Sequence, residues 1–472
     1  MASGSSSPSR KEQSMPVYDI TLTGGRVMDP ESGTDRVANV GVSDGVIQAV
    51  TDETLEGHDS IDASGLVISP GAIDMHSHGQ DHENYVVQVR DGVTTALELE
   101  LGVLDIEKWY GEREGKALVN FGASVGHIPV RMEVMKDPGK MLPIADAAYK
   151  AASEKQIEEM KDLMHRGLRD GALAMGFGLA YTPVASRWEA LEMFRVAAHY
   201  GASCHVHMRG MGHKEPLNSI EGLSEVLAAS VTSGAPLHVV HANSSGQHAV
   251  SELLQMIEEA RSNGLDVTTE CYPYTAGMTG IESAILAEGW QEKFGLDYDD
   301  LEWAETGERL TASTFAEYHE IGGIVIVHSM RQDLVDSAVG SPLTAIASDG
   351  YLKDSKGHPR TAGCYSRVLG HYVRESRVLS LMDAIRKISL MPAQRMESLT
   401  PDFKKKGRAS VGADADLMLF DPESLNDRST YREPTLPPEG MHHVLVNGVP
   451  VVRDGVICEG VSPGRGIRAP RA

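Results

Sequence analysis

The spacing of apolar residues divides the chain into two β-rich ends and a middle of mixed character. In 17–29 (VYDITLTGGRVMD), alternating Ile20 and Leu22 precede Gly-Gly and then Arg-Val-Met, which predicts a hairpin. Other short strand-like runs lie near both ends, at 38–50, 61–69, 416–421, 443–447 and 450–453. We therefore expect residues 15–70 and 400–472 to form one composite, sandwich-like β-domain.

The middle of the chain, 71–399, alternates short apolar runs with amphipathic stretches such as 153–169 and 248–262. Apolar strands that alternate with helices are typical of a parallel sheet, and the length fits a (β/α)₈ barrel. The candidate strands are 72–76, 93–99, 122–127, 172–178, 203–208, 236–241, 266–270, 324–328 and 344–348. These are one more than a barrel needs, so one is an extra or misplaced element. Residues 279–321 are too long for a βα loop, which predicts an inserted lid.

Composition and charge limit the kinds of molecule that the protein is expected to bind. Lys and Arg number 43 against 67 Asp and Glu, so the formal charge is −24. A field of that sign disfavours nucleic acids and anionic membranes, and no apolar run approaches the ~20 residues of a membrane span. The four cysteines are scattered without a CxxC pair, which favours reduced thiols and a cytoplasmic protein. Residues 1–14 are Ser-rich and polar, so we expect a disordered tail there.

The segment GAIDMHSHG places Asp74, His76 and His78 on one face of a strand that ends before Gly79. Two imidazoles one strand step apart can hold one divalent metal ion, and barrel enzymes build their sites at the C-terminal ends of strands. The alternative is a pair of surface or barrel-filling histidines, since the chain has 19. The apolar strand and the aspartate before the pair favour a metal site.

Three further segments end apolar strands with residue types that bind metals. CHVHMRG carries His205 and His207, LHVVHANSSG includes His241, and TAIASDG brings Asp349 to a strand tip. A lone carboxylate there is costly unless it pairs with a metal ion, water or a hydrogen-bond donor. Each segment also has a plain structural interpretation: His205 or His238 as a hydrogen-bonded core histidine, and Ser-Asp-Gly as a turn. The order of all these residues along the strands makes the set specific.

This set of segments resembles the amidohydrolase superfamily, and closely its D-aminoacylase (N-acyl-D-amino-acid deacylase) branch. The matching segments are GAIDMHSH (71–78), DGVTTALELE (91–100), VGHIPVR (125–131), GALAMGFGLAYTP (171–183), HVHMRG (205–210), HVVHANSSG (238–246), LDVTTECYPYTAG (265–277), IASDG (346–350), HPRTAGCYSRVLGHYVRE (358–375) and ASVGADADLMLFDP (409–422). The resemblance implies a barrel with a small β-domain, one or two zinc ions, and hydrolysis of the amide bond of N-acyl amino acids, D-isomers in particular. It also implies that His76 and His78 are the strand-1 metal pair, that His207 and His241 hold the tightly bound zinc, and that Asp349 is the catalytic aspartate.

One departure from that branch concerns the ligand after strand 2, where its members carry a Cys. This chain has Leu-Glu-Leu-Glu-Leu-Gly (97–102) instead. Glu100 lies nearer the strand end and is the preferred replacement, with Glu98 as the alternative. A carboxylate suits Zn²⁺, tolerates Mn²⁺ better than a thiolate does, and can bridge two metals. The segment 171–183 contains no Lys, which argues against a carboxylated-lysine bridge.

The expected reaction is attack of a metal-activated water on an amide carbonyl, with Asp349 as general base and then general acid. A substrate with a carboxylate needs a cation close by, and bidentate geometry favours arginine. The candidate substrate-binding residues are Arg360, Arg209, Arg131, Tyr181 and Tyr274.

Two other functions remain open from the residues alone. One is hydrolysis of a different small molecule at the same site, such as a cyclic amide, a dipeptide or a lactone. The other is a non-catalytic scaffold that has kept the barrel. A scaffold should have lost metal ligands, whereas this chain keeps every His and the Asp of the set.

Overall fold

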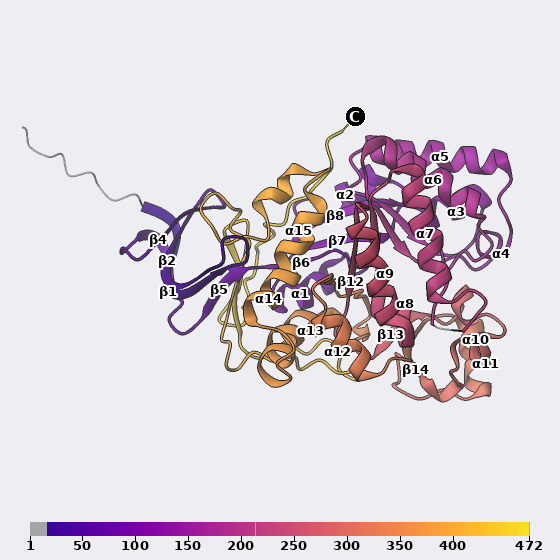
Figure 1. Ribbon diagram of the computed structural model, residues 1–472. Helices are drawn as coiled ribbons and strands as arrows, with labels where there is room; N and C mark the ends of the chain where they lie inside the picture. Colours follow the sequence, from indigo (N-terminus) through magenta and orange to yellow (C-terminus); the bar gives the residue numbers. More distant parts are fainter. Residues whose placement is uncertain (1–16, 213, 472) are drawn as a thin grey trace, which may run out of the picture.

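The computed structural model describes residues 17–212 and 214–471, so the tail expected at 1–14 lies outside the described residues. Its centre is a barrel of eight parallel strands in the order β16-β12-β11-β10-β9-β8-β7-β6. Figure 1 labels four of them, β6, β7, β8 and β12. The eight strands are β6 (Ala72–Asp74), β7 (Val93–Val103), β8 (Asn120–Gly126), β9 (Met175–Gly178), β10 (Cys204–His207), β11 (Leu237–Val239), β12 (Val267–Cys271) and β16 (Thr344–Ile346). They are almost wholly buried, as the apolar runs require, and the predicted barrel is confirmed.

Contacts between β6 and the segment after β16 close the barrel. The amide N of Asp349 donates to the carbonyl O of His76 at 2.7 Å, and Ser77 pairs with Gly350 in a parallel bridge. The carboxylate of Asp74 accepts hydrogen bonds from Ser348 N at 3.0 Å and from Ser348 Oγ at 2.5 Å, across 274 residues of chain. Asp74 therefore joins the first and last strands, although it was expected on the same face as the histidines.

The extra candidate strand is 324–328. It is β15 (Ile324–His328), which pairs antiparallel with β13 (Ala276–Gly280) and β14 (Leu301–Trp303) outside the barrel. Only its second and third residues are fully buried. The run is as apolar as a barrel strand, so its hydrophobicity could not distinguish the two situations.

This three-stranded sheet belongs to an inserted unit, residues 276–328, which also contains α10 (Trp290–Phe294) and α11 (Ala312–Ile321) (Figure 1). The unit has its own apolar cluster, which includes Trp290, Trp303 and Val325. The predicted insertion at 279–321 lies within it, but the unit is longer because it also includes all of β13 and β15, and β15 had been predicted as a barrel strand.

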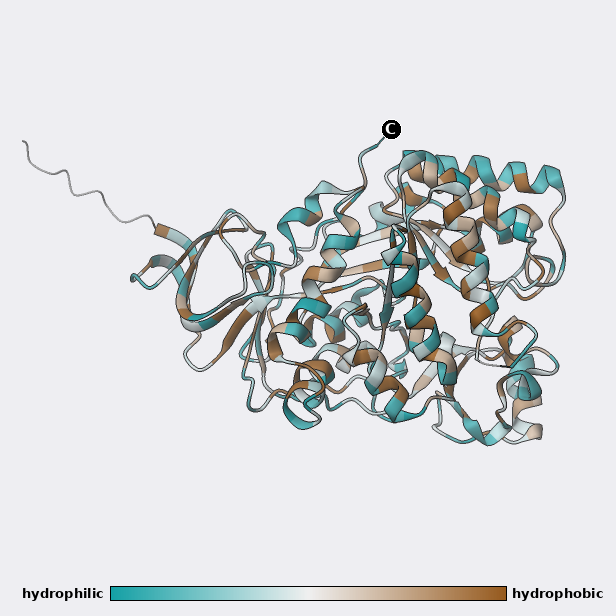
Figure 2. Ribbon diagram, in the orientation of Figure 1, coloured by the Kyte–Doolittle hydropathy of each residue, from teal (hydrophilic) through white to brown (hydrophobic). Residues whose placement is uncertain are grey.

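Helices surround the barrel. The main ones are α1 (His82–Arg90), α2 (Ile106–Arg113), α3 (His127–Met135), α5 (Glu154–Arg169), α6 (Arg187–Tyr200), α7 (Ser219–Ser233), α9 (Val250–Ser262), α12 (Gln332–Gly340), α13 (Arg360–Arg367), α14 (Leu381–Ile385) and α15 (Met391–Met396). Figure 2 shows α5 as largely hydrophilic with a few apolar positions. Of these, Ile157, Met160, Met164 and Leu168 are buried. None of the described helices combines the length and apolar character needed to span a bilayer.

Strands from both chain ends form one nine-stranded sheet, in the order β22-β21-β20-β19-β5-β1-β2-β3, with β4 paired to β1. Its strands are β1 (Val17–Asp29), β2 (Thr34–Ser43), β3 (Val46–Thr51), β4 (Glu56–Asp62), β5 (Val67–Pro70), β19 (Leu417–Phe420), β20 (Met441–Val446), β21 (Val449–Arg453) and β22 (Val456–Ile457). The two ends meet where β5 pairs antiparallel with β19.

The hairpin predicted for 17–29 is wrong. The segment is the single strand β1, and its register against β2 shifts between Leu22 and Gly25. Gly24 has a φ of 72°, which glycine adopts without the steric cost that a side chain would bring. The Gly-Gly pair therefore makes a bulge within a strand and not a turn between strands.

Asp416, next to β19, ties this sheet to the barrel. Its carboxylate accepts from Lys406 Nζ at 2.7 Å, from Asn120 Nδ2 of β8 at 2.9 Å, and from Asn447 N at 2.7 Å. Asp416 is 3% exposed and Lys406 is 4% exposed. Burial opposes the charge on Lys406, but Asp416 and Asp414 outweigh it and raise the pKa of this lysine.

We expect Asp416→Ala to lower the free energy of unfolding by about 3 kcal/mol, because it removes one partner of a buried ion pair. Asp414→Ala is the matched control: Asp414 also pairs with Lys406, at 3.0 Å, but is more exposed. Its loss should cost about 1 kcal/mol or less. Denaturant unfolding of the three proteins checks this, and equal losses for the two variants would contradict the role of Asp416.

Candidate metal centre

Six side chains that were expected to form the site converge at the C-terminal end of the barrel. They come from the segment after β6, from β7, from the end of β10, and from the segments that follow β11 and β16. The residues are His76, His78, Glu100, His207, His241 and Asp349, and all six line one pocket.

One half of the cluster contains His76, His78 and Asp349. The two Nε2 atoms lie 3.2 Å apart, and Asp349 Oδ1 lies 3.5 Å from His76 Nε2 and 3.4 Å from His78 Nε2. One ligand atom from each of the three residues lies within 4.8 Å of the others. This half was expected to hold a metal through its histidines, and Asp349 is close enough to join them.

The other half contains His207 and His241, with Glu100 between the two halves. His241 Nε2 lies 3.2 Å from His207 Nδ1. Glu100 Oε1 lies 3.6 Å from His207 Nδ1, while its Oε2 lies 3.9 Å from His76 Nε2 and 3.7 Å from His78 Nε2. One carboxylate thus presents one oxygen to each half, which is the arrangement of a bridging ligand.

These separations fit divalent metal ions. Ligands of a tetrahedral zinc at bond lengths of 2.0–2.2 Å lie roughly 3.3–3.6 Å apart, close to the observed nitrogen–nitrogen and nitrogen–oxygen distances. His76 Nδ1 and His78 Nδ1 face the carboxylates of Glu270 at 2.6 Å and Glu98 at 2.9 Å. When these rings are neutral and donate from Nδ1, both Nε2 lone pairs point into the cluster. Glu100 Oε1 is buried without a hydrogen-bond partner in the described chain, so a cation there would satisfy it.

Geometry also separates the two glutamates that alternation could not. Glu98 Oε2 faces His78 Nδ1, and Glu98 Oε1 accepts from Gly102 N at 3.2 Å. Both of its oxygens are therefore engaged at the edge of the cluster, whereas Glu100 reaches its centre. The arrangement favours Glu100 as the ligand and Glu98 as the residue that orients His78.

Burial and charge set the protonation of the cluster. Burial lowers the pKa of His207 and of His241 to about 3, so both rings are neutral at neutral pH, as metal ligands must be. Burial opposes charge on His76 as well, but Asp349 and Glu270 outweigh it and raise the pKa of His76. Burial would also raise the pKa of Asp349, yet Arg360 and His76 hold it well below its usual range. The neutral rings of His207 and His241 and the ionised carboxylate of Asp349 therefore favour the binding of a cation at the cluster.

Two residues of the cluster have strained backbone conformations. His241 has a φ of 31° and Asp349 a φ of 52°, both in the left-handed region that non-glycine residues rarely adopt. Such conformations cost about 1–3 kcal/mol each and persist where the surroundings impose them, often at functional sites. Here they direct the two side chains inward from the ends of β11 and β16.

A buried hydrogen-bonded chain supports the cluster from below. Glu270 on β12 contacts His76 Nδ1 through Oε1, and its Oε2 lies 3.0 Å from His238 Nε2. His238 Nδ1 in turn lies 2.7 Å from Thr268 Oγ1, and His205 packs its ring against that of His238. The structural interpretation of His205 and His238 as hydrogen-bonded core residues fits this placement. Sequence reasoning missed Glu270, although it shares the signal that identified Asp349, a carboxylate near the end of an apolar strand.

Of the candidate substrate-binding residues, Tyr181 lines the pocket and Tyr274 does not. The residue that does so from that segment is Tyr272, while the hydroxyl of Tyr274 is buried with no hydrogen-bond partner among the described residues. Arg360 is fully buried; its Nη2 lies 2.9 Å from Asp349 Oδ2 and its guanidinium stacks on the Tyr272 ring.

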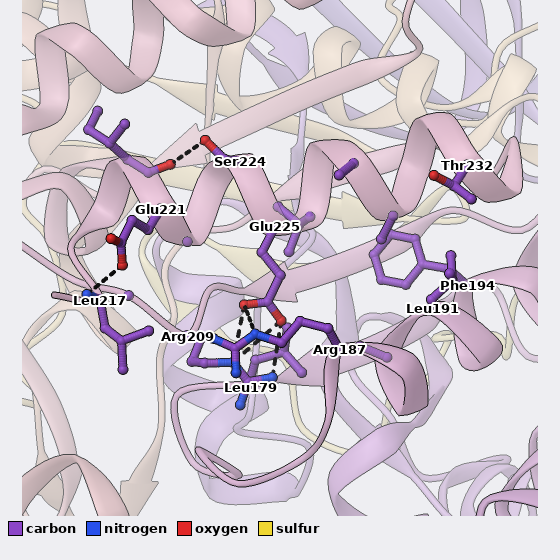
Figure 3. Close-up of a pocket in the computed structure, with 17 residues that line it drawn as sticks. Leu179, Arg187, Leu191, Phe194, Arg209, Leu217, Glu221, Ser224, Glu225 and Thr232 are labelled. Carbon is purple, nitrogen blue, oxygen red and sulfur yellow. Dashed lines mark hydrogen bonds and ion pairs between the residues drawn. The ribbon is translucent and has the colours of Figure 1, made fainter.

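Arg209 and Arg131 lie apart from the candidate metal ligands. Arg209 pairs with Glu225 of α7 at 3.1 Å in a separate groove between α6 and α7, where Arg187 approaches the same carboxylate (Figure 3). Arg209 Nη1 donates to the carbonyls of Thr182 and Pro183. Arg131 is buried against Glu189. Both guanidiniums therefore already have partners within the protein, and neither lines the pocket that contains the histidines.

The inserted unit covers the cluster with an apolar wall. The apolar residues that line the pocket are Met211, Met278, Ile285, Leu286, Phe294, Leu296 and Val327. An outer cavity of about 560 Å³ shares His78, Glu100, Tyr181 and Asp349 with the pocket. The pocket and the outer cavity therefore meet at these four residues.

Several known proteins are similar to this chain in sequence and in fold. Residues 126–452 match the model of the Amidohydro_3 family, described as an amidohydrolase family. A D-aminoacylase from Alcaligenes xylosoxydans xylosoxydans is 30% identical, over 92% of this chain and 94% of that protein. A solved N-acyl-D-glutamate deacylase from Bordetella bronchiseptica, complexed with zinc and a phosphonate mimic of the tetrahedral intermediate, has 27% identity and a TM-score of 0.81 over 96% of this chain and 100% of that one. A D-aminoacylase solved to study its binuclear metal centre has 25% identity and a TM-score of 0.82, with the same coverage.

We expect Glu270→Gln to weaken zinc binding by about 10- to 100-fold, because the amide cannot hold His76 as the charged carboxylate does. Competition with a chelating dye measures the affinity, and a thermal melt verifies that the variant is folded. Glu302→Gln is the matched control, since Glu302 is a buried carboxylate 3.0 Å from His328 Nε2 in the inserted unit. Unchanged zinc affinity in the folded Glu270 variant would contradict the role of Glu270.

Proposed function

This chain belongs to the amidohydrolase family, and on that premise we propose that it hydrolyses the amide bond of N-acyl-D-amino acids to a carboxylate and a free amino acid. The observation that carries the proposal is the convergence of four histidines and Glu100 with Asp349 at the open end of the barrel. The relatives named D-aminoacylase and N-acyl-D-glutamate deacylase support the choice of substrate class.

The proposed metal ligands are His76, His78, Glu100, His207 and His241, with Zn²⁺ as the ion and Mn²⁺ as an alternative that a carboxylate ligand permits. Metal ions held there would lower the pKa of a water molecule and polarise the scissile carbonyl. Glu100, with one oxygen toward each half of the cluster, supports a site for two ions.

Asp349 is the proposed general base and acid. The contact with Arg360 keeps its carboxylate ionised, and the ionised form is the one that accepts a proton. Its Oδ1 faces the histidines at 3.4–3.5 Å, where the attacking water would lie. Having taken the water's proton, the same oxygen can deliver it to the leaving amine nitrogen.

A cation is proposed to recognise the substrate carboxylate, and Arg360 is the favoured candidate. Its Nε and Nη1 are buried and have no hydrogen-bond acceptor in the described part of the chain, and its guanidinium contacts Asp349 and Tyr272, which line the pocket. Lys140 and Lys353 line the outer cavity and would attract an anionic substrate to an otherwise acidic protein. Tyr181, whose ring lies 5.1 Å from that of His207, is the proposed hydrogen-bond donor to the substrate.

We extend the proposal to the organisation of the chain. Residues 15–70 with 400–472 are assigned as the β-domain, 71–399 as the catalytic barrel, and the insertion at 279–321 as a lid over the metal ligands. The pocket wall contributed by Ile285, Leu286 and Phe294 supports the lid. A cytoplasmic location is proposed as well, supported by cysteines that are all free.

We expect Asp349→Asn to reduce turnover of N-acetyl-D-methionine by at least about 10²-fold, because an amide cannot act as general base. At least one equivalent of zinc should remain, since Glu100, His207 and His241 are untouched. Initial rates and metal analysis of the same preparation test both points. Wild-type turnover in the variant would contradict the assignment of Asp349.

We expect N-acetyl-D-leucine and N-acetyl-D-methionine to be hydrolysed with kcat/KM at least about tenfold above N-acetyl-D-glutamate, because the apolar wall leaves a buried carboxylate unpaired. A panel with these compounds, their L-isomers, a dihydropyrimidine, a dipeptide and a lactone measures the preference. Faster hydrolysis of the last three classes would favour the alternative hydrolase. A folded protein that binds no Zn²⁺ or Mn²⁺ and cleaves none of them would indicate a scaffold.

A further inference from the structure

A second polar cavity lies at the opposite end of the barrel from the metal ligands. Its volume is about 260 Å³. Asp266 and Leu343, which line it, directly precede β12 and β16, so it opens at the N-terminal ends of these strands. The remaining wall comes from the end of α9, from η5 (Arg386–Leu390) and from α15. We call it the N-terminal pocket.

Three arginines line the N-terminal pocket against a single carboxylate. They are Arg261 at the end of α9, Arg386 at the start of η5 and Arg395 on α15, and the carboxylate is that of Asp266. Arg261 and Arg386 are exposed and take part in no ion pair within the described ranges. The pocket is therefore locally positive, in a protein whose formal charge is −24.

Arg395 is the buried member of the three. Its side chain is 5% exposed, and its Nη1 contacts Asp266 Oδ1 at 2.6 Å. Its Nε and Nη2 are buried without a hydrogen-bond partner among residues 17–212 and 214–471. Buried N–H donors without acceptors are costly and rare, so two of them on one charged group call for an acceptor. Burial also lowers the pKa of Arg395 even though Asp266 is beside it.

Hydroxyl and amide groups complete the lining. Gln394 and Ser398 lie beside Arg395, and Thr268 and Thr269 come from the start of β12. These groups donate hydrogen bonds to oxygen without adding charge. The planar fork of arginine matches the spacing of oxygens in carboxylate, sulfate and phosphate.

We propose that the N-terminal pocket is a binding site for a small oxyanion, held by Arg395 with Arg261 and Arg386. The volume lies below the roughly 300–1,000 Å³ of pockets for larger ligands, which limits the anion to a compact one. Three arginines and one aspartate leave an excess of two positive charges, which suits a dianion. The site is independent of the proposed hydrolysis, because it shares none of the metal ligands.

Calorimetric titration of the zinc-loaded full chain with sulfate tests the site, in chloride buffer at constant ionic strength. We expect saturable binding, and at least about a tenfold loss of affinity in the double variant Arg261→Ala/Arg386→Ala. Both residues are exposed, so the double variant should stay folded. Arg169→Ala is the matched control: Arg169 is an exposed arginine in the last turn of α5, and its loss should leave sulfate binding unchanged.

Two further measurements complete the experiment. Arg395→Lys keeps the charge but removes the planar fork, and it should also weaken sulfate binding at least about tenfold in a protein that melts normally. Titrations with inorganic phosphate and with succinate distinguish the sources of the oxyanion, and tighter binding of either than of chloride supports the site. The proposal is overturned if none of the three anions binds more tightly than chloride, or if the double variant binds sulfate as the wild type does, as an anion at the zinc would.

Discussion

The hydrogen bond from Asp349 N to the carbonyl of His76 closes the barrel and at the same time assembles its site. If the first and last strands of a parallel barrel stay unpaired, each leaves a row of backbone donors and acceptors without partners, which is costly where they are buried. Closure by β16 against β6 therefore brings the chemistry of two distant segments to the same place. Asp74 strengthens this closure through Ser348, and the candidate metal ligands His76 and His78 follow it in the chain.

Charged side chains can be buried at the C-terminal end of the barrel because nearly all of them contact a side chain that can carry the opposite charge. Glu98 and Glu270 face the outer nitrogens of His78 and His76, and Arg360 faces Asp349. The carboxylate of Glu100, with one oxygen lacking a hydrogen-bond partner in the described chain, is the exception. The same contacts thus stabilise the buried side chains and orient the candidate metal ligands. The Glu100 oxygen that lacks a hydrogen-bond partner among the described residues leaves an excess of negative charge, which favours a bound cation.

The two ends of the barrel have opposite electrostatic character. The C-terminal end gathers carboxylates around histidines, whereas the N-terminal pocket gathers arginines around one aspartate. Between them, Glu270, His238 and Thr268 fill the interior with hydrogen-bonded groups, and His238 and Thr268 also line the N-terminal pocket. A chain of hydrogen-bonded polar groups thus connects the two ends of the barrel, whereas the largest apolar cluster packs strands against the surrounding helices.

The sequence by itself predicted the barrel, which the structure confirms. It also placed His76, His78, His207, His241 and Asp349 at strand ends, because periodicity and strand-end position are local properties. Alternation alone could not separate Glu98 from Glu100, because it puts both on the same face, and only nearness to the strand end favoured Glu100. The tertiary contact of Glu98 with His78 Nδ1 then places Glu98 at the edge of the cluster. Apolar character alone also could not distinguish β15 from a barrel strand, or a bulge at Gly24 from a turn. The tertiary structure decided these points, together with Glu270, Tyr272 and the internal partners of Arg209, because each depends on which distant residue lies opposite.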